Sequence, residues 1–481
     1  MSEPRKHRNY VGGTWVDSPG EIGNVNPSDT GDIVGLFAQA DEDLAAQAVE
    51  AAAAATPNWA QSTPQERFNA LDFTGSEILK RKEELGMLLS REEGKTLPEG
   101  IGEVTRAGHI FKWFAGEALR LSGEHQPSVR PGIDVDVLRQ PLGVIGIITP
   151  WNFPIAIPAW KIAPALAFGN SVVFKPADLA PGSAWAVAEI LSRSGMPEGV
   201  FNLVMGRGRV VGEAIINHPA VSGISFTGSV ETGRHIATAC ANRMARVQLE
   251  MGGKNPLVVL DDADLETAVN AAVNGAYFST GQRCTASSRL IVTEKIHDRF
   301  VRAMVERLGS LKVDHALNPG TDIGPVIDES QLEKDLAYVE IGLKEGGTLA
   351  YGGERLTREK NGFYMAPALL TETRNNMRIN REEVFGPVAT VIRVSGYDEA
   401  LGAANDTEFG LSAGICTGSL KHASHFKQHA EAGMVMVNLP TAGVDYHVPF
   451  GGSKRSSYGT REQGRYAVEF YTTVKTCYVA P

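Results

Sequence analysis

Residues 141–250 alternate between short apolar segments and amphipathic segments with helical spacing, and this alternation restricts the fold more than any other feature of the chain. A single helix between two strands carries the chain back to the end of the sheet where it began, so consecutive strands pair in parallel. The pattern therefore predicts an α/β protein with a doubly wound parallel sheet. The expected strands are 143–148, 171–174, 200–204, 222–226 and 246–250.

Polar and glycine-rich turns follow these expected strands. A doubly wound sheet binds its ligand at the carboxyl ends of the strands, where these turns should lie. A lysine, hydroxyl groups and glycines suit a phosphate-bearing ligand, although glycine turns can also serve only to make tight connections. The GxGxxG fingerprint with a ribose-binding acid is absent from the sequence. The turns are Thr149-Pro150-Trp151-Asn152, Lys175-Pro176-Ala177-Asp178, Gly206-Arg207-Gly208 with Gly212, Phe226-Thr227-Gly228-Ser229 and Glu250-Met251-Gly252-Gly253.

A second α/β unit begins at Pro256. Three acids, Asp261, Asp262 and Asp264, precede its first helix and could bind a metal ion, but an acid at a helix start is usually an N-cap. The 11 histidines show no metal-binding spacing, so no metal site is assigned. The expected elements of this unit are a strand at 257–260, a helix at 264–278 and a strand at 290–293.

Cys284 lies between that helix and the following strand, among small, polar and flexible residues. A cysteine that only fills a hydrophobic core would have Val, Leu or Ile as neighbours. Gly281 permits a turn whose N–H groups can bind an incoming group. Ionising the thiol at pH 7 costs roughly 2 kcal/mol, which the adjacent Arg283 and a helix N-terminus could supply. The stretch makes Cys284 a candidate nucleophile, but taken alone it does not outweigh the alternative of an inert thiol, because free cysteines are usually inert.

The first 120 residues read mainly as helices that cover the sheet, with little chemistry of their own. One helix should begin with Asp41 as its cap and end before Pro57. A second should begin at Thr63-Pro64, and two more are expected at 83–93 and 100–121.

Residues 122–141 are extended, and residues 471–479 have a matching β character. We expect the two segments to pair in an outlying sheet that makes subunit contacts. A homodimer or homotetramer is therefore expected.

Composition argues against several classes of protein. The net charge of −10 disfavours a nucleic-acid binder, which needs a basic face. The four cysteines lack zinc-site spacing and fit a reducing compartment. We find no signal peptide and no apolar run long enough to span a membrane. A cytoplasmic protein without a nucleic-acid or membrane partner is expected.

Several segments, taken in order along nearly the whole chain, resemble motifs of the aldehyde dehydrogenase superfamily. Each motif alone is weak, whereas the ordered set is specific. The segments are Pro150-Trp151-Asn152-Phe153, Lys175-Pro176, Phe226-Thr227-Gly228-Ser229, Leu249-Glu250-Met251-Gly252-Gly253-Lys254, Gly281-Gln282-Arg283-Cys284, Glu383-Val384-Phe385-Gly386-Pro387 and Pro449-Phe450-Gly451-Gly452.

The resemblance implies a catalytic role for three residues. Cys284 would attack the aldehyde carbon and form a thiohemiacetal. The Asn152 amide and the Cys284 backbone N–H would hold its oxygen. After hydride transfer to nicotinamide, Glu250 would activate water to hydrolyse the thioester, so that no metal is needed. Glu250 could instead be a cap, and Asn152 a turn former.

The resemblance also implies that the cofactor is NAD or NADP. Lys175 would contact the adenosine ribose, and Asp178 stands where an acid favours NAD by repelling a 2′-phosphate. NAD is therefore favoured. The implied cofactor-binding residues are Thr149, Pro150, Trp151, Lys175, Asp178, Gly208, Gly212, Phe226, Gly228, Ser229, Gly233, Met251, Gly252, Glu383 and Phe385.

For the aldehyde substrate, the resemblance implies a tunnel walled by Phe153, Trp160 and Phe450. Arg283 could clamp a distal anion of the substrate, or could instead form a structural ion pair. Glu462 matches a family carboxylate that is sometimes part of a proton relay, with a surface charge as the alternative. The loop 440–449 and the tail 461–476 look most like α-ketoglutarate semialdehyde (2,5-dioxopentanoate) dehydrogenases.

These inferences predict NAD(P)-dependent oxidation of an aldehyde to a carboxylate, with a semialdehyde that bears a second carboxylate as the substrate. The alternatives are a succinate semialdehyde or broad-specificity enzyme, a CoA-acylating enzyme, a catalytically silent scaffold and a thiol hydrolase. The expected domains are a cofactor domain at 1–121 and 142–252, a catalytic domain at 253–460 and an oligomerisation element at 122–141 and 461–481.

Overall fold

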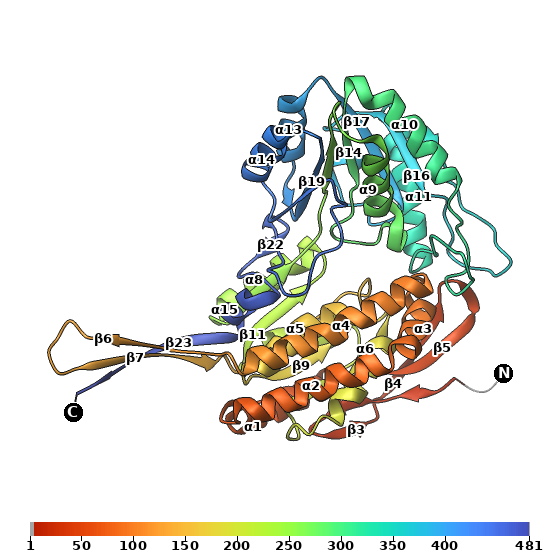
Figure 1. The fold of residues 1–481 in the computed structure, drawn as a ribbon. Coiled ribbons are helices and arrows are strands. Elements are labelled where there is room, and N and C mark those ends of the chain that lie inside the picture. The colour runs from red at the N-terminus through yellow and green to blue at the C-terminus, as the bar shows by residue number, and fades with distance from the viewer. Residues whose placement is uncertain (1–3, 481) are drawn as a thin grey trace.

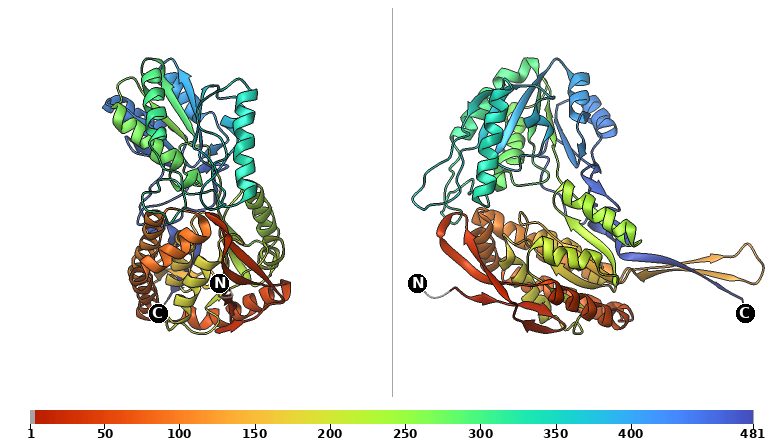
Figure 2. Two further views of the ribbon diagram at one scale, coloured as in Figure 1. Left: turned by 90° about the vertical axis from the view of Figure 1, so that its right-hand side faces the viewer. Right: turned by 180° about the vertical axis from the view of Figure 1, so that it is seen from behind.

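The structure is a computed structural model and describes residues 4–480. Two large sheets form the centres of two α/β units, which lie one above the other in Figure 1, and a narrow β arm projects sideways from the lower unit. The view from behind in Figure 2 shows that the arm stands clear of the helices. The predicted α/β fold class is confirmed.

The lower sheet contains the predicted parallel strands. Its members are β2 (Asn9–Val11), β3 (Thr14–Val16), β8 (Val144–Ile148), β9 (Ser171–Lys175), β10 (Phe201–Leu203), β11 (Val221–Thr227), β12 (Arg246–Glu250) and β22 (Ser457–Tyr458). The strand order is β22-β12-β11-β8-β9-β10-β2-β3, and the strands from β12 to β10 pair in parallel. Their carboxyl ends share one edge, because Ile148 pairs with Lys175 and Phe226, and Thr227 pairs with Glu250.

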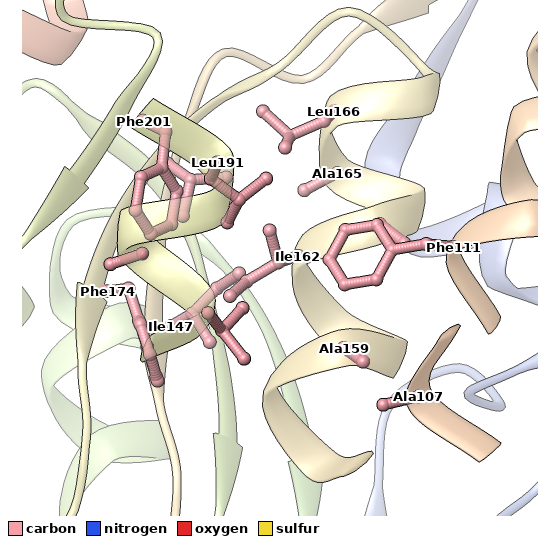
Figure 3. Close-up of a cluster of buried hydrophobic side chains, with 14 of the residues drawn as sticks. Ala107, Phe111, Ile147, Ala159, Ile162, Ala165, Leu166, Phe174, Leu191 and Phe201 are labelled. Carbon is pink, nitrogen blue, oxygen red and sulfur yellow. The ribbon is translucent and has the colours of Figure 1, made fainter. Parts of the chain in front are cut away.

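Helices cover both faces of this sheet. They are α1 (Glu42–Ala60), α2 (Pro64–Lys80), α3 (Lys82–Glu93), α4 (Leu97–Ala118), α5 (Ala156–Ala167), α6 (Pro181–Ser192), α7 (Glu213–Asn217) and α8 (Val230–Asn242). Alternate strand residues point to opposite faces, so Ile147 and Phe174 join a core with α2, α4, α5 and α6, while Val144 and Val173 join a core with α1, α7 and α8. In Figure 3, α5 lies between Phe111 of α4 and the strand side chains. The doubly wound arrangement is confirmed.

Helix α1 differs from its prediction at the carboxyl end. Asp41 caps it as predicted and accepts a hydrogen bond from a first-turn N–H at 2.9 Å, but the helix continues past Pro57. Proline removes one backbone donor, although here the loss falls in the last turns. Trp59 beyond it is buried and donates its Nε1–H to the Leu166 carbonyl at 3.1 Å. The burial of Trp59 outweighs the missing bond, so the expected end before Pro57 is wrong.

The upper sheet carries the second predicted unit. Its strands are β13 (Pro256–Val259), β14 (Arg289–Thr293), β15 (Thr348–Tyr351), β16 (Ala368–Thr373), β17 (Val388–Val394), β19 (Ser412–Cys416) and β20 (Met434–Val437), in the order β15-β16-β17-β14-β13-β19-β20. Its helices are α9 (Leu265–Tyr277), α10 (Glu294–Gly309), α11 (Glu329–Lys344), α12 (Arg378–Arg381), α13 (Tyr397–Asn405) and α14 (Leu420–His429). Asp264 caps α9 and accepts from the Thr267 N–H at 2.8 Å, which confirms the N-cap interpretation for that acid.

The arm consists of β6 (Glu124–Pro127), β7 (Asp134–Pro141) and β23 (Thr472–Val479), all antiparallel. The pairing of Thr472 with Pro141 through to Val479 with Asp134 confirms the predicted sheet between these distant segments. Its role in subunit contact stays a prediction, as does the division into domains. Strand β22 lies within the range 253–460 that was expected to form the catalytic domain, but it pairs with β12 of the lower sheet.

Smaller elements complete the fold. They are β1 (Lys6–His7), β4 (Gly20–Asn26), β5 (Asp29–Gln39), β18 (Phe409–Gly410), β21 (Ser453–Lys454), α15 (Val468–Tyr471) and single helical turns at Gly208–Gly212, Phe278–Gly281 and Gly464–Ala467. Within residues 4–480, no helix is long and apolar enough to cross a membrane. The same part of the chain holds no group of three or more His, Cys, Asp or Glu side chains placed to bind a metal ion.

Candidate active site

Asn152 contacts the loop that carries Cys284, although the two residues come from different units. Asn152 is buried in the loop after β8, and its Nδ2 donates to the Gln282 carbonyl at 2.9 Å. A carboxamide has two N–H donors, so the other one is left for a ligand. The contact therefore orients the Asn152 amide toward the cysteine loop.

The loop before Cys284 has an unusual backbone. Ser279, Thr280 and Gly281 have φ values of 51°, 55° and 66°, in the left-handed region. A Cβ atom added to Gly281 would lie 2.1 Å from the Gly386 carbonyl oxygen, so only glycine fits there. This geometry turns the chain sharply between the end of α9 and Cys284.

Asn255 fixes the other side of the cysteine loop. Its Nδ2 donates to the Cys284 carbonyl at 2.8 Å and to the Ala286 carbonyl at 3.0 Å, while its Oδ1 accepts from the Ser412 N–H at 3.0 Å. Sequence reasoning missed this residue. The signal was its position directly after the Gly252-Gly253-Lys254 turn.

The Cys284 thiol lacks the activating surroundings that the sequence suggested. Burial, followed by the charges of Glu383 and Glu250, raises the pKa of the Cys284 thiol to about 12, although the N–H groups of Cys284 and Thr285 oppose this. The expected helix N-terminus is absent, because Cys284 follows the carboxyl end of α9, where the helix dipole is negative. The Arg283 guanidinium donates instead to Ser279 Oγ at 2.9 Å and to Glu99 at 3.4 Å. The predicted activation by a cation and a helix N-terminus is therefore wrong.

Glu250 ends β12 and is buried. Burial raises the pKa of this carboxyl well above its ordinary value, and the nearby Glu462 carboxylate raises it further. Ser457 Oγ donates to Glu250 Oε2 at 2.5 Å, and Gln248 Nε2 donates to Oε1 at 3.2 Å. This is the environment that a general base near neutral pH requires.

Glu462 is buried rather than a surface charge. It forms an ion pair with Lys161 of α5, whose Nζ also donates to Ser225 Oγ at 3.0 Å. Its backbone exchanges hydrogen bonds with Phe450 at 2.7 and 2.9 Å. Glu462 is therefore part of a buried polar cluster that includes Glu250, and the surface alternative is excluded.

A cavity of about 270 Å³ opens on Cys284. All of the predicted substrate residues lie on its wall, and the rings of Trp160 and Phe450 lie 5.3 Å apart. Contact with a substrate stays a prediction for each of them. The cavity is lined by Arg106, Phe153, Ala156, Ile157, Trp160, Asn274, Arg283, Cys284, Thr285, Ala442, Gly443, Val444 and Phe450.

The expected cofactor residues gather along the shared edge of the lower sheet. The Lys175 ammonium pairs with Asp178 at 2.9 Å. Thr149 Oγ1 and Thr227 Oγ1, at the ends of β8 and β11, are buried without a hydrogen-bond partner in the described structure. An added Cβ at Gly208 or Gly212 would meet nothing within 4 Å. Orphan hydroxyls, a lysine and open glycine turns fit a dinucleotide at this edge.

The remaining expected cofactor residues lie nearby. Ser229 caps α8, accepting from the Thr232 N–H at 3.2 Å, and Gly228 N–H donates to the Glu250 carbonyl at 3.0 Å. Glu383 Oε1 accepts from the Gly253 N–H at 2.8 Å. The ring of Trp151 meets the ring of Phe385 edge to face at 5.5 Å. Gly233 packs on Met251, Gly252 packs on Glu383, and Phe226 packs on Gly228.

The comparisons with known proteins decide what this arrangement is. Residues 15–477 match the aldehyde dehydrogenase family. The chain belongs to this family. It is 42% identical to an alpha-ketoglutaric semialdehyde dehydrogenase of Bacillus subtilis over 100% of this chain and 99% of that protein, and 44% identical to an alpha-ketoglutarate semialdehyde dehydrogenase of Haloferax volcanii over 99% of each. A crystal structure of a betaine aldehyde dehydrogenase from Staphylococcus aureus with NAD+ superposes with a TM-score of 0.96, at 35% identity over 98% of this chain and 95% of that one.

The protein is therefore an NAD(P)-dependent aldehyde dehydrogenase, which oxidises an aldehyde to a carboxylate. In this aldehyde dehydrogenase, residues of a region that the sequence predicts only as helical cover also contact these loops and the cavity. Lys95 lies between α3 and α4, and Glu99, Glu103 and Arg106 lie on the first three turns of α4.

Proposed function

We propose that this aldehyde dehydrogenase acts on a semialdehyde with a carboxylate at its far end, such as α-ketoglutarate semialdehyde, which it converts to 2-oxoglutarate. The observation that carries the proposal is Arg106, a guanidinium on the cavity wall. Among residues 4–480, Arg106 forms no ion pair; its Nη2 donates to Gln463 Oε1 at 3.3 Å, and its Nε has no partner. The two relatives named above act, by their names, on this aldehyde.

The charge balance of the cavity supports an anionic substrate. The charges of Glu103, Asp445 and Cys284 act on Arg106 from a distance, but burial lowers its pKa more than they raise it. A buried guanidinium with free donors binds a carboxylate by charge-assisted, bidentate hydrogen bonds. Arg283 adds a second positive group to the same wall, although Glu99 already neutralises part of it. Together, these groups disfavour a cationic aldehyde.

Arg106→Met is expected to raise KM for α-ketoglutarate semialdehyde by roughly 10- to 100-fold, which corresponds to the free energy of a hydrogen bond between charged groups. Pentanal has the same chain length without the carboxylate, so its KM should change by less than about 3-fold. Steady-state kinetics with both aldehydes and with succinate semialdehyde measure this. Arg283→Met is the matched variant, and it should also lower kcat with pentanal because it loosens the cysteine loop. Equal losses with both aldehydes in Arg106→Met would contradict an anion site.

In the proposed mechanism, Cys284 attacks the aldehyde carbon, and the free N–H of Asn152 and the backbone N–H of Cys284 stabilise the resulting oxyanion. A thiol with a raised pKa needs a base, and the Glu250 carboxylate, whose charge acts on Cys284, takes that proton. The bound dinucleotide supplies the hydride acceptor. Glu250 must release the thiol proton before it can act again, and we assign that release to the buried pair of Glu462 and Lys161. The freed carboxylate then takes a proton from the water that attacks the thioester, which expels the Cys284 thiolate and releases the carboxylate product.

Glu462→Gln is expected to move the acid limb of the kcat–pH profile to lower pH by roughly one unit. Glu250 must be ionised to act, so the rate rises with pH through its pKa. The Glu462 charge raises that pKa, and its removal leaves Lys161 to lower it. Glu469→Gln, an exposed acid paired with Arg139, is the control and should leave the profile unchanged. A limb that stays in place or moves to higher pH would remove Glu462 from this role.

The residues at the cofactor edge support NAD as the preferred cofactor. Asp178 is partly exposed beside Lys175, where its carboxylate would repel a 2′-phosphate. Comparing kcat/KM for NAD and NADP tests the preference, and a higher value with NADP would contradict it.

The arm supports a homodimer or homotetramer, because Val474 and Tyr478 of β23 are 59% and 62% exposed. Sedimentation equilibrium tests this assignment, and a monomer would contradict it. The four free cysteines support a reducing, cytoplasmic location.

A further inference from the structure

The junction between α3 and α4 contacts both loops that carry the reacting groups. Lys95, which follows the C-cap of α3, contacts the Asn152 loop, and Glu99 in the first turn of α4 contacts the Cys284 loop. We propose that Lys95 is a positioning residue for the oxyanion donor: with Glu103, it fixes the backbone of Asn152 so that the free amide N–H points at the aldehyde oxygen.

The Lys95 ammonium is enclosed and fully engaged. The side chain is 2% exposed, and its Nζ donates to the carbonyl oxygen of Asn152 and to Glu103 Oε2, the latter at 2.9 Å. A second buried carboxylate, Glu93, lies 3.7 Å from Nζ. Its Nζ also lies 3.7 Å from the ring centroid of Phe153, the next residue of the loop. One cation therefore binds the backbone of Asn152 and the side chain of Phe153, which walls the substrate cavity.

Glu103 extends this contact to the start of α5. While its Oε2 accepts from Lys95, its Oε1 accepts from the N–H groups of Ile155 and Ala156 at 3.0 and 3.1 Å. The loop 152–156 is thus held at its first residue by Lys95 and at its last two residues by Glu103. Because both groups are buried, neither contact is weakened by water.

Glu99 holds the opposite loop from the same short segment. Its Oε1 accepts from the Ser279 N–H at 2.7 Å and lies 3.4 Å from Arg283 Nη2. Two residues only four apart in sequence, Lys95 and Glu99, therefore hold the loop of Asn152 and the loop of Cys284. An oxyanion donor acts only when it is aimed at the developing charge, and a displacement of about 1 Å can cost on the order of 100-fold in rate.

Lys95→Met tests the proposal, since methionine keeps the length and removes the donors. We expect kcat to fall by about 30- to 100-fold and KM to change by less than about 3-fold, because the donor acts in the transition state. The rate of Cys284 alkylation by iodoacetamide should change by less than about 2-fold, because that reaction has no oxyanion. Lys112→Met is the matched control and should keep full activity, because Lys112 lies on the side of α4 that faces α2, where its Nζ pairs with Asp72.

A double-mutant cycle with Asn152→Ala separates positioning from general damage. If Lys95 acts through Asn152, Lys95→Met should cost less than about 2-fold in the Asn152→Ala background. The proposal is wrong if the losses in kcat of the two single variants multiply in the double variant. It is also wrong if Lys95→Met lowers the alkylation rate as much as it lowers kcat. If Lys95→Met does not fold, Glu103→Gln serves in the same cycle: its Oε1 still accepts from Ile155 and Ala156, while the anchor for Lys95 is lost. A loss for Glu103→Gln that persists without the Asn152 amide would overturn it as well.

Discussion

Cys284→Ala is expected to lower kcat for aldehyde oxidation by at least about 10⁴-fold, because alanine offers no atom that can bond to the carbonyl carbon. The fold should survive, since Cys284 is partly exposed in a cavity and its loop is held through the backbone by Asn255. Binding of NAD should persist, because the predicted cofactor residues lie along the edge of the lower sheet and do not depend on the thiol. Reduced-cofactor formation and calorimetric NAD titration measure the two effects separately.

Cys416→Ala is the matched control for this experiment. Cys416 is buried in β19 with 1% exposure, so its truncation should cost on the order of 1 kcal/mol of stability and leave kcat nearly unchanged. Substantial aldehyde oxidation by Cys284→Ala would exclude a covalent mechanism at this site. Loss of NAD binding in the same variant would mean that the cysteine loop also shapes the cofactor site.

The lower sheet could be predicted because its signal is local. Short apolar runs separated by single helices allow only parallel pairing, and that pairing brings the ends of β8, β9, β11 and β12 to one edge. The sequence therefore predicts that the turns at Thr149, Lys175 and Glu250, which are far apart in sequence, lie along one edge of the sheet. Their proximity follows from topology and needs no knowledge of side-chain packing.

The polar side of α4 could not be recognised in the same way. Glu99, Glu103 and Arg106 recur at helical spacing, opposite the apolar residues that enter the core, and such a charged stripe normally faces water. Here the stripe faces the loops 152–156 and 279–283, so it is enclosed. Tertiary contacts decide whether a polar stripe on a helix is enclosed or solvated. The sequence of the helix alone does not reveal these contacts.

The ionisation of Cys284 shows the same limit. Arg283 is adjacent in sequence, yet its guanidinium turns toward Glu99, while Glu383 and Glu250 approach the thiol from distant segments. The charge next to a residue in sequence is therefore a poor guide to the charge next to its side chain. The consequence for the chemistry is that Glu250 has two protons to move, one from the thiol and one from water.

Glu250→Gln is expected to separate these two tasks and to lower steady-state turnover by about 10²- to 10⁴-fold. Glutamine has the shape of the protonated acid and can still accept from Ser457, so the site should bind aldehyde and NAD as before. Once the thiol has lost its proton to solvent, a slow burst of one reduced cofactor per site should follow. The burst should then stall, because no base activates water against the thioester.

The stalled species identifies the step. Intact mass spectrometry of Glu250→Gln should show the acyl group on the protein, and its absence in Glu250→Gln/Cys284→Ala would locate it on Cys284. Hydroxylamine needs no base to attack a thioester, so it should restore turnover in Glu250→Gln up to the rate of the slow burst and release the hydroxamate. A normal steady rate without hydroxylamine would remove Glu250 from its role as base.

Stability gives an independent check on the same residue. Burial and Glu462 raise the pKa of Glu250 in the folded protein, so the contribution of this carboxyl to stability is full below its ordinary pKa and is lost as pH rises through the raised value. Above that value, the wild-type protein keeps a charge that burial disfavours. Glu250→Gln removes that charge, and its melting temperature should therefore equal that of the wild type at low pH and exceed it at high pH. A variant that is less stable at high pH would show that the ionised carboxylate is held by stronger contacts than those of Ser457 and Gln248, and such a carboxylate would be a poor base.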